Sequence, residues 1–226
     1  MPFLLLGLLF LLLILGPGMW ARWVLRRHAA PREEYPGTGG ELARHLLDRH
    51  GLEAVPVEIT DSGDHYDPIE KVVRLGEANY RGKSLTAVAV AAHEVGHALQ
   101  HQAGYRPLSL RTDMARWAHR AQRLGSWLFV AVPLVALLTR VPHTGGLLLL
   151  AGLLSFGVAV LIHLITLPVE FDASFRRALP LLEEGYIDPR DQASARHVLA
   201  ACAVTYVAAA LADILNLGRW LALLRR

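Results

Sequence analysis

The sequence predicts a mainly α-helical membrane protein with about four transmembrane helices and a small α+β domain. Three observations lead to this prediction. Hydrophobic residues make up 53% of the 226 residues, and the mean hydropathy of +0.32 is higher than a soluble domain of this size usually shows. Charged residues, 19% of the chain, are concentrated between apolar blocks. Two short β-branched runs, 55–59 and 71–75, flank a turn-rich stretch and predict a hairpin or two paired strands.

The first apolar block predicts an uncleaved N-terminal anchor, assigned to residues 1–23. Residues 2–19 are apolar without interruption, and at about 1.5 Å per residue they would span roughly 27 Å, close to the hydrocarbon thickness of a bilayer. A signal peptide would need basic residues before the block. Here they follow it, together with tryptophans, as at a membrane interface: Trp20, Arg22, Trp23, Arg26 and Arg27.

The remaining chain divides into a polar domain over residues 24–123 and a second membrane part. Within the polar domain, a helix is predicted over 41–50, before Gly51, and a long helix over 85–101, after a capping Ser84. Later apolar segments predict a transmembrane hairpin over 124–167 and a C-terminal transmembrane helix with a basic tail over 198–226. A polar segment, 168–197, separates them.

Charge and cysteine content restrict the classes of function. Nineteen of the 23 Lys and Arg lie in residues 22–123 and 171–197, so the positive-inside rule places both regions in the cytoplasm. The net charge of +3 is too small and too dispersed to predict nucleic-acid binding. The single cysteine, Cys202, excludes an intramolecular disulfide and a CxxC metal site. The sequence carries no signal for an oligomeric state.

The segment His93-Glu94-Val95-Gly96-His97 matches the motif HExxH. Residues four apart share one face of a helix, so the imidazoles of His93 and His97 can reach one metal ion. Glu94 can then accept a proton from a water on that metal, as the catalytic base of a zinc peptidase does. The motif lies in an otherwise apolar helix, AVAVAAHEVGHALQ, where an unpaired charge is costly. This context favours a zinc site over a chance match on a surface helix.

A third metal ligand must come from another segment. Glu170, just beyond a predicted span, is expected to complete a His-His-Glu set plus water, and Asp172 to orient a ligand imidazole by a hydrogen bond. Asp213, an acid within an apolar helix, is the alternative third ligand. His101 lies about 12 Å from His93 along a straight helix, so it is expected to lie near the site without binding the metal.

A polar cluster over residues 64–67 precedes the motif helix and has two interpretations. Either His65 or Tyr66 donates a hydrogen bond to the substrate oxyanion, or the cluster is only a turn rich in Asp and Pro. The strand predicted over 71–75 is expected to line the cleft and pair with an extended substrate.

Five segments, in order from residue 64 to the C-terminal region, carry a resemblance to a known family. They are DHYDPIEKVVRL (64–75), SLTAVAVAAHEVGHALQH (84–101), YRPLSLR (105–111), LPVEFDASFRRAL (167–179) and TYVAAALADILNL (205–217). The chain resembles the YugP-like neutral zinc metallopeptidases of bacterial membranes and, more loosely, the HtpX-like peptidases. The resemblance implies a zincin-like catalytic domain with Glu170 as third ligand. It departs at Ser174, where the HtpX-like pattern has an aspartate.

Together these observations predict a zinc metalloendopeptidase of the gluzincin type, anchored in the bacterial inner membrane with its catalytic domain in the cytoplasm. The expected cofactor is Zn²⁺, and the expected partners are a membrane-associated peptide or protein substrate and the lipid bilayer. One alternative is an intramembrane site-2-type zinc protease, although residues 64–83 are very polar for that. The other is a non-catalytic zinc-containing membrane scaffold or chaperone, which would not need Glu94.

Overall fold

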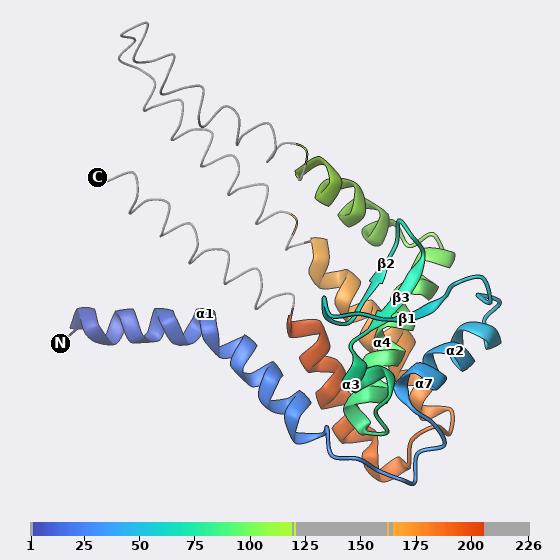
Figure 1. Cartoon of the computed structure of the whole chain (residues 1–226). Helices are drawn as coiled ribbons and strands as arrows, with labels where there is room; N and C mark the ends of the chain where they lie inside the picture. Colours follow the sequence, from blue (N-terminus) through green and yellow to red (C-terminus); the bar gives the residue numbers. More distant parts are fainter. Residues whose placement is uncertain (1, 119, 121–161, 163–164, 206–226) are drawn as a thin grey trace, which may run out of the picture. The chain divides into compact units, whose positions relative to one another are not determined.

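The chain forms two compact units, Met1–Tyr105 with Leu167–Arg226, and Arg106–Thr166. The computed structural model describes residues 2–118, 120, 162 and 165–205 (Figure 1). In the second unit, residues 106–118 are helical. The described residues that were expected to form the site all belong to the first unit.

The motif helix is α4, Leu85–Gln102, and it lies at the centre of the first unit. Ser84 caps its N-terminus by accepting a hydrogen bond from the Ala87 backbone N–H at 3.1 Å. Every residue from Leu85 to Gln100 is buried, so the helix has no solvent face along most of its length. Its many alanines allow neighbouring elements to approach closely. The helix predicted over 85–101 is therefore confirmed.

Helix α2, Gly39–Arg49, packs against α4. Thr38 and Glu41 form a reciprocal capping box at its N-terminus, and Leu42, Leu46 and Leu47 are buried at helical spacing. The predicted helix over 41–50 is confirmed, with its start two residues earlier than the sequence pattern indicated.

A three-stranded sheet lies against α4, in the order β1-β3-β2 (Figure 1). Strand β1 (Val57–Ile59) pairs with β3 (Val72–Leu75) in parallel, and β2 (His65–Asp67) pairs with β3 antiparallel. The predicted paired strands are confirmed, but the hairpin interpretation is wrong. The stretch between them forms strand β2, which pairs with one edge of β3. Strand β1 pairs with the opposite edge of β3.

The other side of α4 is covered by the segment that follows residue 166. Helical residues 167–171 continue into a π-helix, η1 (Asp172–Ala178), then α7 (Leu179–Glu183) and the short η2 (Pro189–Asp191). Residues 192–205 are helical and bury Val198 and Leu199 in the core shared with α4. The small helix α3 (Glu77–Tyr80) joins the sheet to α4.

Helix α1, Pro2–Arg27, is the segment that the sequence assigned to a membrane anchor. Within the described residues, no helix combines the length and the apolar character needed to cross a bilayer. This finding overturns the predicted fold with about four transmembrane helices. The last turns of α1 belong to the core instead: Ala21 and Val24 are 1% and 3% exposed. Thr86 of α4 donates a hydrogen bond to the Leu25 carbonyl at 2.7 Å.

The other predicted spans fall largely on residues that the structure does not describe. Most of the hairpin over 124–167 and residues 206–226 of the C-terminal helix lie outside the described residues, and so does Asp213. The described start of that helix, residues 198–205, contributes Val198, Leu199 and Ala201 to the protein core.

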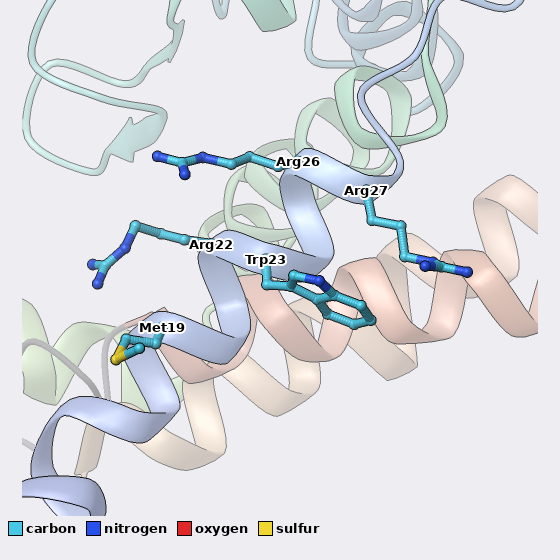
Figure 2. A pocket seen from close by; sticks show the side chains of 5 residues that line it. All are labelled: Met19, Arg22, Trp23, Arg26 and Arg27. Carbon is cyan, nitrogen blue, oxygen red and sulfur yellow. The ribbon is translucent and has the colours of Figure 1, made fainter.

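A shallow surface hollow lies at the C-terminal end of α1 (Figure 2). Arg27 stacks over Trp23, with its guanidinium carbon 5.3 Å from the ring centroid. The hollow is basic and aromatic, lined by Met19, Arg22, Trp23, Arg26 and Arg27. Towards the N-terminus the same helix exposes large apolar side chains: Leu5, Leu6, Leu8, Leu9 and Leu12 are each more than 60% exposed.

Candidate metal centre

His93 and His97 lie one turn apart on α4 and turn their rings towards each other. The ring centroids are 4.7 Å apart with an interplanar angle of 78°. Both residues are buried, at 2% and 3% exposed. The local helix geometry alone accounts for this pairing, because residues four apart lie on one face.

Glu170 approaches these rings from the helical segment that leads into η1. Its side chain is fully buried, and its Oε2 atom lies 3.2 Å from His93 Nε2 and 3.3 Å from His97 Nε2. In a tetrahedral zinc site with bonds of about 2.0–2.1 Å, neighbouring ligand atoms are about 3.3–3.4 Å apart. The candidate ligand atoms of the three residues all lie within 4.8 Å of one another. The spacing therefore fits one tetrahedral metal ion.

The hydrogen bonding of the rings also fits a metal ion. His97 Nε2 is buried and has no hydrogen-bond partner among the described residues, although a carboxylate oxygen lies 3.3 Å away. The Nδ1 atom of the same ring faces the Gln100 Oε1 atom at 2.9 Å, which accepts its proton. Nε2 then presents a lone pair towards an anionic oxygen, and two acceptors at that distance repel each other. A cation between them removes the repulsion.

Gly96 lets the segment of Glu170 come close to α4. A Cβ atom at this position would lie 2.7 Å from the carbonyl oxygen of Ala173, at the start of η1. That distance is shorter than any ordinary contact, so a side chain at residue 96 would push the two helices apart. The glycine inside the motif thus sets the distance between the histidines and Glu170.

Glu94 lies beside the candidate ligands and is 4% exposed. Burial, with the charges of Glu170 and Asp64, raises its pKa to about 7, against opposing effects from His93 and a hydrogen bond from the Tyr66 backbone. Its Oε2 atom is buried without a hydrogen-bond partner among the described residues. A carboxyl group with a pKa near neutrality can take up and release a proton during one catalytic cycle.

Glu170 shows the opposite electrostatic behaviour. Burial on its own would raise the pKa of this carboxyl group, but positive charge and Nε2 protons on the His97 and His93 rings outweigh burial and hold the pKa below its usual range, and a metal cation bound at the same Nε2 atoms would act in the same direction. Two buried carboxyl groups near the same two rings are therefore held in different states. Glu170 is ionised, as a ligand must be, and Glu94 is poised to exchange a proton.

Of the residues expected around the substrate, Tyr66 and His101 lie together, whereas His65 lies against another part of its own loop. The Tyr66 hydroxyl and His101 Nδ1 are 2.8 Å apart, and both side chains are partly exposed. Burial, with the charge of Asp67, raises the pKa of Tyr66 to about 12. Burial and Lys71 lower the pKa of His101. His65 instead faces the Gly63 carbonyl at 2.8 Å.

Of the two aspartates in the same cluster, Asp67 forms the local turn that was one of the two interpretations, whereas Asp64 makes long-range contacts. Asp64 accepts hydrogen bonds from the Gly76 backbone and the Asn79 side chain, each at 2.8 Å. Asp67 accepts from the backbone N–H groups of Ile69 and Glu70 at 2.7 and 3.0 Å. These contacts shape the loops around β2, and Tyr66 is the member that turns towards α4.

Two residues near the candidate ligands were not singled out from the sequence as contributors to the site. Gln100 lies between His97 and Asp172, whose Oδ2 atom accepts from Gln100 Nε2 at 2.9 Å. Ser174 contacts His93 Nδ1 at 3.0 Å. Asp172 was expected to bond an imidazole directly, and it reaches His97 through Gln100. A polar glutamine in an otherwise apolar helix, three residues after His97, was the available signal.

Comparison with known proteins gives two matches. A family model described as "Putative neutral zinc metallopeptidase" matches residues 3–225. The Bacillus subtilis (strain 168) protein named "Putative membrane protease YugP" is 40% identical over 212 residues, which cover 91% of each chain. No solved structure matches the chain. The two matches confirm the family resemblance stated from the sequence.

Proposed function

Because the chain belongs to the family of neutral zinc metallopeptidases, we propose that it is an endopeptidase that holds zinc through His93, His97 and Glu170. The observation that carries the ligand assignment is the meeting of three buried ligand atoms from two segments, with Nε2–Oε2 distances of 3.2 and 3.3 Å. Two histidines and a glutamate, with a fourth position left for water, form the gluzincin-type set. A third ligand from a membrane helix, as in the intramembrane alternative, is then not needed.

The chemistry divides between the metal and the residues of the chain. Zinc at this site would polarise the substrate carbonyl and lower the pKa of a bound water. Glu94 accepts the proton of the attacking water and delivers it to the leaving amine, as its pKa of about 7 favours at neutral pH. Tyr66 donates a hydrogen bond to the carbonyl oxygen as negative charge develops there, with His101 holding the phenol in place at 2.8 Å.

An edge strand offers a binding place for the substrate backbone. Strand β2 is one of the two outer strands of the sheet, and the hydrogen bond from the Tyr66 backbone to Glu94 indicates that its free edge faces the site. An extended peptide can add to such an edge through main-chain hydrogen bonds. The sequence had assigned this role to residues 71–75, but β3 lies between two strands and both of its edges are occupied.

The substitution Glu94→Gln tests the proposed function. Because Glu94 is assigned to proton transfer and not to metal binding, the variant is expected to keep stoichiometric zinc while hydrolysis falls by about 10²–10⁴-fold. Zinc is measured by elemental analysis, and hydrolysis with an internally quenched peptide library. Wild-type protein that binds zinc but cleaves no peptide would favour the scaffold alternative, and equal cleavage by Glu94→Gln would refute the assigned base.

A stability measurement can establish that the Glu94→Gln variant is folded. A buried carboxyl whose pKa is raised from 4.5 to about 7 destabilises the folded state above that pKa, and the cost disappears below the unfolded-state pKa. At pH 8 the metal-free Glu94→Gln variant is therefore expected to unfold with a free energy higher by up to about 3 kcal/mol, and at pH 4 the difference should vanish. Denaturant titration of both proteins without zinc measures this difference.

We also propose that the peptidase works against the cytoplasmic face of a bacterial membrane, with α1 contacting lipid. The name of the Bacillus subtilis relative, the exposed leucines of α1 and its basic, aromatic hollow support contact with a membrane. Vesicle flotation of the full chain is expected to depend on anionic lipid and to weaken about fivefold for each of Arg22, Arg26 and Arg27 changed to Gln. Arg190→Gln, at an exposed site in η2, is the control. Flotation that ignores lipid charge would contradict the proposal.

A further inference from the structure

A buried chain of hydrogen bonds beside His97 has no role in the proposed mechanism. Gln100 is completely buried and three residues beyond His97 on α4. Its Oε1 atom lies 2.9 Å from His97 Nδ1. Its Nε2 group donates to the Val169 carbonyl at 2.7 Å and to Asp172 Oδ2 at 2.9 Å. Asp172 in turn accepts from Arg177 Nε at 2.8 Å.

The chemistry of these partners fixes which way the Gln100 amide faces. A backbone carbonyl and a carboxylate can only accept hydrogen bonds, so the NH₂ group of Gln100 must face Val169 and Asp172. The amide oxygen must then face His97. Because that oxygen can only accept, the proton of the neutral imidazole must lie on Nδ1, which leaves Nε2 free to bind a metal ion.

We propose that Gln100 is a positioning residue that fixes His97 in the Nδ1-protonated tautomer, with its own orientation set by Asp172 and Arg177. This inference rests on the proposed zinc site. The segment that supplies Glu170 thus also sets, through Val169 and Asp172 on either side of it, the form of a ligand on the other helix. When this segment packs against α4, it therefore both brings Glu170 to the histidines and selects the tautomer of His97.

The other candidate ligand shows the same proton pattern by different means. Ser174 donates its hydroxyl proton to the Leu199 carbonyl at 3.0 Å, so towards His93 Nδ1, also at 3.0 Å, it can only accept. Both rings therefore present an unprotonated Nε2 towards Glu170. His93 relies on one hydroxyl and a backbone carbonyl, whereas His97 depends on an amide that a charged pair orients.

The substitution Gln100→Leu, compared with Gln102→Leu, tests the proposal in the full-length protein. Gln102 is a glutamine on the same helix, but it is exposed and donates a hydrogen bond to the His50 carbonyl at 3.0 Å. Zinc affinity, measured by competition with a chromophoric chelator, is expected to fall about 10–100-fold in Gln100→Leu and to stay unchanged in Gln102→Leu. In ¹⁵N–¹H spectra of the zinc-loaded protein, one exchange-protected Nδ1–H signal of the ligand histidines should disappear in Gln100→Leu alone.

A second variant covers the case in which Gln100→Leu does not fold. Asp172→Asn can donate as well as accept, so it no longer enforces the Gln100 orientation, and a smaller loss of zinc affinity with a weakened Nδ1–H signal is expected. Wild-type zinc affinity with an intact Nδ1–H signal in either folded variant would overturn the proposal. That result is separate from failure of the proposed function, which would show as a wild-type protein that neither binds zinc nor cleaves peptide.

Discussion

The two sides of the site differ in burial and in what they contribute. On the ligand side, formed by α4 and the segment of Glu170, the three candidate ligands His93, His97 and Glu170 are each at most 3% exposed. The opposite side presents Tyr66 of β2 and His101 of the last turn of α4, which are both partly exposed. Burial strengthens the electrostatic interactions around a metal ion, while a partly open rim is needed to admit a peptide. We therefore expect the two sides to control different quantities, metal affinity on one and turnover on the other.

The largest effect is expected on the ligand side. Glu170→Gln should weaken zinc binding by more than about 100-fold, which is beyond the usual cost of losing a group that only orients a ligand. Asp172→Asn, two residues away in the same segment, should lose less. Asp213→Asn should be nearly normal. Chelator competition on the three variants ranks them, and a reversed order, with zinc lost only in Asp213→Asn, would move the third ligand to the C-terminal apolar segment.

A smaller effect is expected on the β2 side. Tyr66→Phe should keep stoichiometric zinc while kcat falls about 10²–10³-fold, as for loss of one oxyanion donor. With its pKa raised to about 12, the phenol remains protonated at neutral pH, so the loss should be constant between pH 6 and 9. Tyr186→Phe, whose hydroxyl bonds the Gly37 carbonyl, is the matched control. Unchanged kcat in Tyr66→Phe would remove β2 from the chemistry.

The sequence predicted the helices better than the sheet and the membrane part. Helix α4 begins where its capping Ser84 predicted, and the apolar spacing located α2, although the Thr38 cap was not recognised and the start of α2 was predicted two residues late. The parallel pairing of β1 with β3 depends on where the chain between them packs, which no local pattern gives. Apolar character was interpreted as membrane-spanning, but in α1 and at residues 198–205 part of it serves the protein core.

For the candidate site, the sequence by itself determined the spacing of His93, Glu94 and His97, because a helix sets the positions of residues within one turn. The position of Glu170 just beyond an apolar segment pointed to it as the third ligand, and the family resemblance implied the same residue. Only the tertiary structure decided which groups surround these residues. Gln100 meets Asp172 across 72 residues of chain, and Ser174 meets His93 across 81. Such contacts exist because Gly96 lets two distant helices approach, and that packing depends on the whole core.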